Sequence, residues 1–414
     1  MYEKEVKQLY CEECKQFLPD RYVEGKCPKC GSIARGDQCD ECGTLLDPLE
    51  LTDRKCKLCG SEPIVKSSKQ LYFALSRFND TVRNNLERNK DYWRVNAVNN
   101  TDRYLNEGLC DRAISRDLSW GIDIPIDGYE DKKVYVWIDA VLGYLTISKK
   151  YAEIKGFDYK KFWNKDAISI YVHGKDNIPF HSVILPALLS AIGEDKLPDR
   201  IISSEYLTLE GKKISTSKNY AIWIPDIVDK YNTDALRYFF IKNAPEKRDT
   251  DFSIREFIKC NNGELLGAYG NLVNRTLAFN KKYFDNKILK SQVDSSIIEK
   301  LNDLYKSVGK QIEKGELKNS LEDIFEFIRS VNKYFDEEKP WATIKEDTEK
   351  CKTTIYNCTF AIANIANLLA PFLPQSSEKV NEWLGTGSNE WKVVDLKDKQ
   401  EVGPFSILFE RLEN

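Results

Sequence analysis

The feature that most constrains this chain is a run of paired cysteines within its first sixty residues. Eight of its twelve cysteines form four Cys-x-x-Cys pairs: Cys11/Cys14, Cys27/Cys30, Cys39/Cys42 and Cys56/Cys59. A two-residue spacer places two thiolates on one tight turn, and four thiolates close one tetrahedral site, so the pattern predicts two structural Zn2+ ions. The alternative is a redox motif, but that is normally a single copy at the start of a helix.

Composition and charge narrow the class of protein. The amino-terminal residues 1–5 are charged and lack the apolar core of a signal peptide, and no apolar run has the length of a transmembrane helix. We therefore expect a cytoplasmic protein without a membrane partner. The 62 Lys and Arg residues are balanced by 65 Asp and Glu residues, for a net charge of -3. If the partner is a nucleic acid, local patches and not bulk charge must recognise it.

The middle of the chain has the pattern of an α/β unit. Near-continuous apolar runs at residues 133–139 and 167–172 predict buried parallel strands, and residues 201–202 open a third. Helical patterns at 140–154 and 179–191 alternate with these strands. Ligands bind at the carboxyl ends of strands in such sheets, where this reading places Asp139, Asp176 and His181.

Beyond about residue 249 the hydrophobic period becomes helical. Apolar residues spaced three and four apart mark stripes at residues 265–277 and 321–335, and a third apolar stretch spans residues 360–373. Pro340 is expected to end the second of these helices. This part of the chain therefore predicts an all-α bundle.

Three motifs in a fixed order resemble a known enzyme family. The segments 134–144 (VYVWIDAVLGY), 174–181 (GKDNIPFH) and 213–217 (KISTS) resemble the second half of a class I aminoacyl-tRNA synthetase catalytic domain. The cysteine knuckles before them and Pro340-Trp341 after them narrow the resemblance to the methionyl-tRNA synthetases. Nearly the whole chain is covered, and the specificity lies in the combination of motifs.

The resemblance implies a fold and a division into domains. It implies a partial Rossmann-type α/β catalytic domain with a zinc-knuckle insertion, followed by an all-α anticodon-binding bundle. The implied domains are a connective zinc-knuckle domain at 1–106, the second half of the catalytic domain at 107–205, a KMSKS-loop region at 206–258 and the anticodon-binding domain at 259–414. It also implies nested zinc pairing, in which Cys27, Cys30, Cys39 and Cys42 share one ion and Cys11, Cys14, Cys56 and Cys59 share the other.

The family's methionine and ATP sites carry over to specific residues. The methionine pocket is implied to be lined by Trp137, Ala140, Tyr144, Asn177 and His181, and a thioether packs well on such aromatic faces. Gly174 and Asp176 match the positions that hold the ATP ribose. The second histidine of the chain, His173, does not match the family pattern and is interpreted as a strand-end residue without a catalytic role.

The segment around Lys213 matches the family's KMSKS loop. Its implied catalytic residues are Lys213, Ser215, Ser217 and Lys218, and Lys213 is also expected to bind ATP. Positive charge here stabilises the negative charge that builds on the phosphates when the adenylate forms, with ATP entering as its Mg2+ complex. Thr216 replaces the motif's second lysine, so the phosphate contact at that position stays open. The alternative interpretation of this segment is a basic loop that is simply exposed to solvent.

Three residues of the bundle match the family's anticodon contacts. Asn271 and Arg275 are four residues apart and so share one helix face, and Trp341 offers a ring on which an unpaired base can stack. The implied partner is tRNA(Met). Surface capping and ion pairing are the alternative for Asn271 and Arg275.

The resemblance also defines what the chain lacks. Both histidines are already placed, so the chain cannot hold the HIGH-like motif of class I synthetases. We therefore expect either a fragment or a chain completed by a separate amino-terminal half. The function implied is a methionine–tRNA ligase that is inactive without that half. A non-catalytic zinc-containing tRNA-binding module is the alternative, and a zinc-ribbon interaction protein ranks last because it leaves Trp137, Asp176, Lys213 and Trp341 unexplained.

Overall fold

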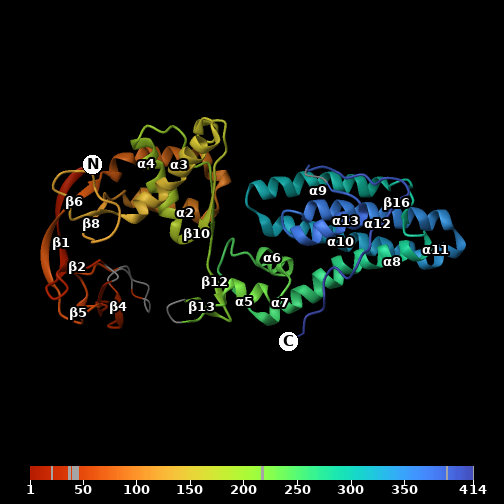
Figure 1. The fold of residues 1–414 in the computed structure, drawn as a ribbon, viewed down its shortest axis with the longest axis horizontal. Helices are drawn as coiled ribbons and strands as arrows, with labels where there is room; N and C mark the ends of the chain where they lie inside the picture. The colour runs from red at the N-terminus through yellow and green to blue at the C-terminus, as the bar shows by residue number, and fades with distance from the viewer. Residues whose placement is uncertain (20–21, 36–38, 40–45, 216–218, 388–389, 414) are drawn as a thin grey trace. The chain divides into compact units, whose positions relative to one another are not determined.

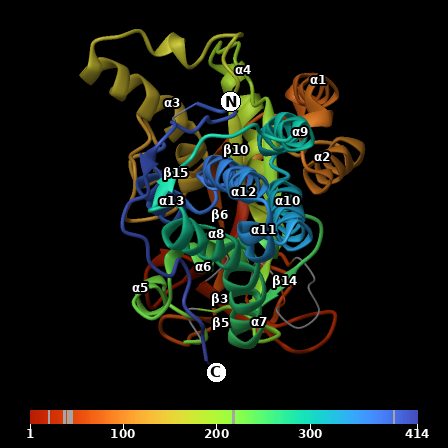
Figure 2. The ribbon, with the colours of Figure 1, turned by 90° about the vertical axis from the view of Figure 1, so that its right-hand side faces the viewer.

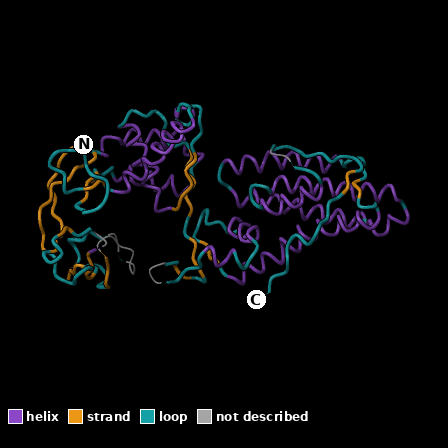
Figure 3. Tube along the Cα trace, viewed as in Figure 1, coloured by secondary structure: helices purple, strands orange, loops and turns teal. Residues whose placement is uncertain are grey.

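The computed structural model describes residues 1–414 except 20–21, 36–38, 40–45, 216–218, 388–389 and 414. Within these residues the chain divides into two compact units, Met1–Ile201 and Ile202–Asn414. Strands are concentrated in the first unit and long helices in the second (Figure 3). None of the helices in the described part of the chain combines the length and apolar composition that crossing a bilayer needs.

The first unit is built on a long antiparallel ribbon. Strand β1 (Tyr2–Cys11) pairs with β6 (Ile64–Phe73), with Tyr2 opposite Tyr72 and Tyr10 opposite Ile64. The short strands β2 (Gln16–Phe17) and β7 (Arg112–Ala113) complete a sheet of order β2-β1-β6-β7. A smaller sheet of order β4-β3-β5 lies between the two long strands in the sequence, formed by β3 (Val23–Lys26), β4 (Ile33–Arg35) and β5 (Thr52–Cys56). Two of the paired cysteines, Cys11 and Cys56, are the last residues of β1 and β5.

Helices and two further strand pairs form the rest of the first unit (Figure 1). The helices are α1 (Asn79–Asn89), α2 (Val95–Glu107), α3 (Val136–Lys155), the π-helical turn η6 (Phe180–Ile184) and α4 (Leu185–Ala191). The strand pairs are β8 (Ser115–Arg116) with β9 (Lys133–Val134), and β10 (Ile170–Gly174) with β11 (Arg200–Ser204). The predicted strands at 167–172 and 201–202 and the helix at 179–191 are thus present.

The predicted strand at 133–139 is wrong. Only Lys133–Val134 is extended, and α3 begins at Val136 and runs for 20 residues. A helix with apolar residues on both faces reads as a continuous apolar run, which periodicity alone cannot distinguish from a buried strand. Asp139 consequently lies in the first turn of a helix and not at the end of a strand. The expected unit of three parallel strands is reduced to the pair β10 and β11.

The second unit opens with a small sheet and continues as helices. Strand β12 (Leu207–Leu209) lies between β13 (Lys212–Lys213), which is antiparallel to it, and β14 (Thr250–Phe252), which is parallel to it. Figure 2 views several of the long helices nearly end-on. The helices are α5 (Ile224–Val228), α6 (Thr233–Lys242), α7 (Ile254–Cys260), the π-helix η8 (Asn261–Gly270), α8 (Asn271–Tyr283), α9 (Ser295–Glu313), α10 (Leu317–Glu338), α11 (Pro340–Glu346), α12 (Thr348–Leu369) and α13 (Pro374–Leu384).

The bundle packs as its hydrophobic stripes predict. The stripe at 321–335 is buried along α10, and the apolar stretch that starts at Phe360 makes the carboxyl half of α12 buried on every side. Pro340 occupies the first turn of α11 directly after α10 ends at Glu338, so the predicted stop is confirmed. The short pair β15 (Lys287–Ile288) and β16 (Gln400–Glu401) ties the carboxyl-terminal segment to the end of α8.

Candidate active site, metal centres and anticodon site

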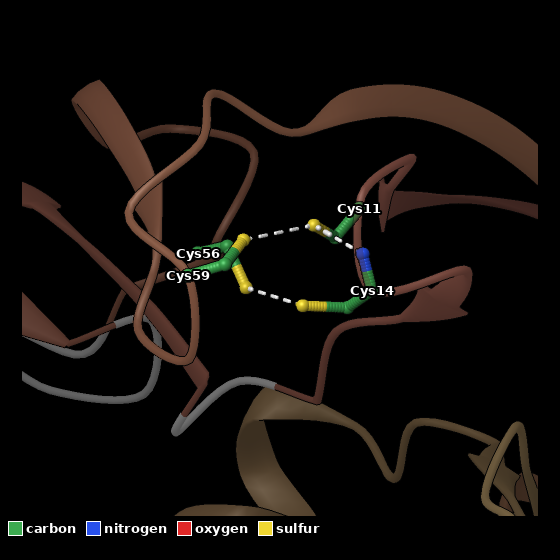
Figure 4. Close-up of side chains that lie close together, drawn as sticks. All are labelled: Cys11, Cys14, Cys56 and Cys59. Atoms are coloured by element: carbon green, nitrogen blue, oxygen red, sulfur yellow. Dashed lines mark hydrogen bonds between the residues drawn. The ribbon is translucent and has the colours of Figure 1, made fainter.

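One cysteine cluster is complete among the described residues. Cys11 ends β1 and Cys56 ends β5, while Cys14 and Cys59 lie on the turns that follow (Figure 4). The four sulfur atoms all lie within 4.8 Å of one another, with Cys11 Sγ 3.4 Å from Cys59 Sγ and Cys14 Sγ 3.9 Å from Cys56 Sγ. Zinc–sulfur bonds of about 2.3 Å in a tetrahedron separate the sulfurs by about 3.8 Å, so the cluster has the dimensions of a metal site.

The turns that begin at Cys56 and Cys27 share one geometry. The amide of Cys56 donates to the carbonyl of Ser61 at 2.8 Å, and that of Gly60 donates to the carbonyl of Cys56 at 2.7 Å. The amide of Cys27 makes the matching bond to Ser32 at 2.8 Å. Gly60 has a φ of 79°, which glycine adopts without strain, and the chain can therefore fold back within the turn.

Hydrogen bonding adjusts the thiols of this cluster. Bonds from the Ser61 hydroxyl and the Cys14 amide lower the pKa of Cys11 to about 6. The pKa of Cys14 is raised, chiefly by its hydrogen bond with Cys59. A cation at the centre favours the thiolate form of every ligand, and the geometry therefore fits a metal better than four neutral thiols.

The second cluster is described in part. Cys27, Cys30 and Cys39 bring their sulfur atoms within 4.8 Å of one another, and Cys30 Sγ is 3.5 Å from Cys39 Sγ. Cys42, the expected fourth ligand, and Gly43 lie outside the described residues. Of the four remaining cysteines, Cys351 and Cys358 are buried in the bundle core, while Cys110 is exposed and not part of a core.

The residues expected to form the methionine pocket come from α3, η6 and the turn before η6. Trp137, Ala140 and Tyr144 are three and four residues apart, so the helix places all three on one face, and all three are exposed. The sequence pattern predicts Trp137 in a strand and Ala140 at the start of the following helix. The Trp137 ring lies 5.7 Å from that of Phe180, the first residue of η6.

Two hydrogen bonds and aromatic contacts with two tyrosines hold the ring of His181. Its Nε2 is 2.9 Å from the Tyr144 hydroxyl, and its Nδ1 is 2.9 Å from the Asn177 carbonyl oxygen. Tyr144 and Tyr171 each place a ring centroid 5.6 Å from the imidazole. Burial lowers the pKa of His181 and favours the neutral ring. Asn177 thus contributes its backbone to the pocket, whereas its side chain makes none of these contacts.

The end of β10 carries the expected ribose site. Gly174 ends the strand, and Asp176 follows in the single turn η5 (Lys175–Asn177) with its side chain exposed. A Cβ atom added to Gly174 would meet nothing within 4 Å, so the backbone there is open to an approaching ligand. This turn also carries Asn177, which links the ribose site to His181.

Lys213 lies on the β12–β13 hairpin of the second unit. The hairpin turn has Glu210 and Gly211 at positive φ, and Asp251 accepts hydrogen bonds from Thr208 and from the Gly211 amide. The Lys213 side chain is exposed. Ser215 pairs with Tyr220 through two backbone hydrogen bonds of 2.9 Å. The loop between them contains Thr216, Ser217 and Lys218, which lie outside the described residues.

Two of the three expected anticodon residues meet on one ring. The Arg275 guanidinium of α8 lies 4.1 Å over the ring of Phe335 on α10, and it pairs with Asp336 at 2.8 Å. The Trp341 ring of α11 is 6.3 Å from the same Phe335 ring and is 52% exposed. Asn271, one turn before Arg275, is exposed and lines a hollow with the carboxyl-terminal segment at Ile407–Phe409.

Three residues that contact the expected site residues were given no part in the site by the sequence analysis. Tyr171 and His173 alternate with exposed residues along β10, a period-two signal that places both on its inner face. Phe335 belongs to the predicted bundle stripe, which explained it as core and hid its contact with Arg275. In each case the sequence gives the residue type, whereas the contact with a distant residue is known only from the structure.

Comparison with known proteins agrees with this arrangement. Residues 1–277 match the family described as tRNA synthetases class I (M), and residues 288–405 match the anticodon binding domain of methionyl tRNA ligase. A methionine–tRNA ligase 1 of Alkaliphilus oremlandii is 62% identical over 413 residues, covering 100% of this chain and 76% of that protein. A methionine–tRNA ligase of Bacillus mycoides is 53% identical over 415 residues with the same coverage.

Solved structures give the same fold. The free methionyl-tRNA synthetase of Mycobacterium tuberculosis matches with a TM-score of 0.78 at 23% identity, covering 100% of this chain and 78% of that one. The same enzyme bound by methionyl-adenylate also matches with a TM-score of 0.78. From its two matched domains and its curated relatives, the chain belongs to the methionyl-tRNA synthetases, a family of class I aminoacyl-tRNA synthetases.

Proposed function

We propose that this chain is a methionine–tRNA ligase, which activates methionine with ATP and transfers the methionyl group to tRNA(Met). The observation that carries the proposal is a group of rings, here called the aromatic slot, in which Trp137 contacts Phe180 and Tyr144 contacts His181. The strand end at Gly174 and Asp176, which is open to a ligand, comes just before Phe180 and His181 in the chain. An apolar slot with a few placed polar groups suits a thioether side chain, and a strand-end carboxylate suits a ribose.

The proposed chemistry assigns each group a role. A carboxylate oxygen of methionine attacks the α-phosphorus of ATP, the bond to the bridging oxygen breaks, and pyrophosphate leaves. The ATP, with its Mg2+, is held by Gly174, Asp176 and Lys213. The ammonium groups of Lys213 and Lys218 stabilise the negative charge that develops on the phosphates. Ser215 and Ser217 belong to the same catalytic loop. The terminal ribose hydroxyl of the tRNA then displaces AMP from the methionyl-adenylate.

The two cysteine clusters are proposed as structural zinc sites. Four-cysteine sites with no open position suit Zn2+ and leave no place for a substrate. Cys42 is proposed as the fourth ligand of the cluster formed by Cys27, Cys30 and Cys39. Thiolates must stay reduced to hold zinc, so we place the protein in the cytoplasm.

The domain boundaries from the sequence are retained as functional proposals. These are the zinc-knuckle domain at 1–106, the catalytic segment at 107–205, the loop region at 206–258 and the tRNA-binding bundle at 259–414. Asn271, Arg275 and Trp341 are proposed to read the anticodon of tRNA(Met), with Trp341 stacking on an unpaired base.

We further propose that an amino-terminal half carrying the HIGH-like motif, on this polypeptide or on a separate one, completes the catalytic site. The support is an exposed apolar stripe on α3, which continues the face of Trp137 and Tyr144 through Ile147, Tyr151 and Ile154. The outer face of β10 is also apolar and exposed, at Ile170 and Val172. A helix with apolar residues on both faces normally packs on both sides.

The test is methionine-dependent ATP–pyrophosphate exchange, with and without an amino-terminal segment taken from the 62%-identical relative. We expect no exchange by the chain alone and exchange on mixing, because the added segment supplies stabilising groups to one side of the triphosphate. Without those groups, the rate should be lower by a factor on the order of a thousand. Tyr144→Phe should lower the mixed activity, and Cys110→Ser serves as a matched control. Robust exchange by the chain alone contradicts the need for a partner.

A second outcome distinguishes the alternative function. If mixing restores no exchange while the chain still binds tRNA(Met), a non-catalytic zinc-containing tRNA-binding module is the better description. Retention of the complete aromatic slot argues against that result, because a chain freed from catalysis has no need of it.

A further inference from the structure

The two histidines of the chain stack on each other. His173 and His181 have ring centroids 4.2 Å apart and an interplanar angle of 23°. His173 comes from the inner face of β10 and His181 from η6, so strand and helix meet at this contact. These are the only histidines among 414 residues, and His173 has no place in the proposed chemistry.

The hydrogen bonds of both rings define their tautomers. A carbonyl oxygen only accepts, so His181 Nδ1 must carry a proton to bond with Asn177, and its Nε2 must then accept from the Tyr144 hydroxyl. By the same reasoning, His173 Nδ1 donates to the Gly174 carbonyl oxygen at 2.9 Å. Within the described part of the chain, His173 Nε2 is buried and has no hydrogen-bond partner.

We infer that His173 is a positioning residue of the amino-acid pocket, which holds His181 by ring stacking in the orientation and neutral tautomer that accept the Tyr144 hydroxyl. The inference rests on the proposed methionine site and adds a residue to it. A stacked partner resists rotation of the His181 ring about its last torsion, which is otherwise broad for histidine. It also excludes water from one whole face of the ring.

The charge state supports this role. Burial and the neighbouring His181 lower the pKa of His173 to about 4, although the hydrogen bond to the Gly174 carbonyl raises this pKa. Two neutral rings can stack closely, whereas an imidazolium facing another buried imidazole is disfavoured. The pair therefore keeps the end of the slot uncharged.

The hydrogen bond between Tyr144 and His181 determines which groups this end of the pocket presents to a bound side chain. With its proton committed to His181, the Tyr144 hydroxyl presents oxygen lone pairs to the pocket, and neither Tyr144 nor His181 has a proton left to donate to a bound side chain. A thioether needs no strong donor and gains from aromatic contact. A rotated or protonated His181 would free the Tyr144 proton and bring a hydrated charge into the slot.

The first test reads the tautomers directly. With 15N-labelled histidine, long-range 1H–15N spectra of the whole chain show only two imidazoles, and we expect both in the neutral Nδ1–H form at pH 7. In His173→Ala the single remaining imidazole, His181, should lose this pure tautomer and titrate nearer its ordinary pKa. In His173→Phe, which keeps a stacked ring, the His181 spectrum should stay close to that of the parent. If His173→Ala does not fold, judged by circular dichroism and metal content, His173→Leu replaces it.

The second test uses the exchange assay on the chain mixed with the amino-terminal segment. His173→Ala should raise KM for methionine by roughly threefold to tenfold, the loss expected for one aromatic pair, with kcat changed less than twofold. His173→Phe should restore KM, and Ile192→Ala, an exposed apolar residue at the end of α4, should leave it unchanged.

The outcomes separate this inference from the proposed function. An unchanged His181 spectrum and an unchanged KM in the ringless variants overturn the positioning role. Equal behaviour of His173→Phe and His173→Leu overturns stacking as its cause. If the mixed parent shows no exchange at all, the proposed function fails, while the spectra of the chain alone still decide whether His173 holds His181.

Discussion

At the scale of single residues, the described site is held by contacts between side chains that the sequence keeps far apart. Tyr144 reaches His181 across 37 positions, and Arg275 reaches Asp336 across 61. The first contact satisfies a ring nitrogen of the buried His181, which burial would otherwise penalise, whereas the second is an ion pair whose Asp336 side chain is exposed. The residues expected to bind ligands are therefore also residues that stabilise the fold around them.

The buried histidine pair predicts a pH dependence of stability. The pKa of His173 falls from 6.5 to about 4 on folding, so the unfolded chain binds a proton more readily between these values. Its contribution to the free energy of unfolding is complete above pH 6.5 and is lost as the pH falls toward 4. Denaturant unfolding of the first unit, followed between pH 7.5 and 4.5, should show this decline. His173→Phe should flatten it, and an equally steep profile in that variant would rule out His173 as the source.

The exposed Trp341 ring predicts a loss of RNA affinity on truncation. Trp341→Ala removes one stacking surface, worth about 1–3 kcal/mol for a single-stranded base. We expect tRNA(Met) to bind roughly tenfold or more weakly in filter or anisotropy assays, with no change in bundle stability. Trp120→Ala makes the same chemical change at an exposed position of the first unit and should bind as the parent does. Equal affinity of the two variants would remove Trp341 from the anticodon site.

At the scale of elements, the knuckles show how short strands set ligand positions. β1 and β5 both end on a cysteine, and each following turn presents its second cysteine after two residues. The metal site thus joins two turns that lie more than forty residues apart in the chain. Without an ion, little apolar area fixes these turns, because among the described residues the local core contains nine buried side chains, four of them from cysteines.

Metal analysis should therefore find two zinc ions per chain. We expect Cys56→Ser to lose one ion and retain the other, since Cys56 belongs to the fully described cluster alone. Cys110→Ser, at an exposed cysteine away from both clusters, should keep two. Elemental analysis of freshly purified protein gives the count, and one ion or none in the parent contradicts the assignment.

At the scale of the whole molecule, the two units have separate hydrophobic cores. The core of the second unit gathers residues from Leu209 to Phe409, and the main core of the first unit runs from Phe73 to Ile201. Among the residues described, the cysteine clusters that could hold a metal ion occur only in the first unit. The stability of the two units should therefore respond differently to metal removal.

Calorimetry can separate these responses. We expect two unfolding transitions, of which a strong chelator lowers only one, because removing a ligand of the native state destabilises only the unit that binds it. Far-ultraviolet circular dichroism should assign the unaffected transition to the helical unit. A single transition that shifts as a whole on chelation would mean that the units unfold together.

The sequence by itself determined whatever depends on short spacing. The cysteine pairs, the stripe along α10, the stop at Pro340 and each family motif taken singly all follow from residues within a few turns of one another. The class of fold and the family could be predicted for this reason. The strand expected at 133–139 failed because a helix with apolar residues on both faces and a buried strand share one hydrophobic pattern.

Only the tertiary structure decided which distant residues meet. It put Trp137, Ala140 and Tyr144 on one face of α3, stacked His173 on His181, and linked Arg275 and Trp341 through Phe335. These contacts depend on how β10, η6 and the bundle helices pack, and packing is set by the shape of many side chains together. Short-range spacing in the sequence identifies the motif to which each side chain belongs, and the packing of the folded chain determines which side chains it contacts.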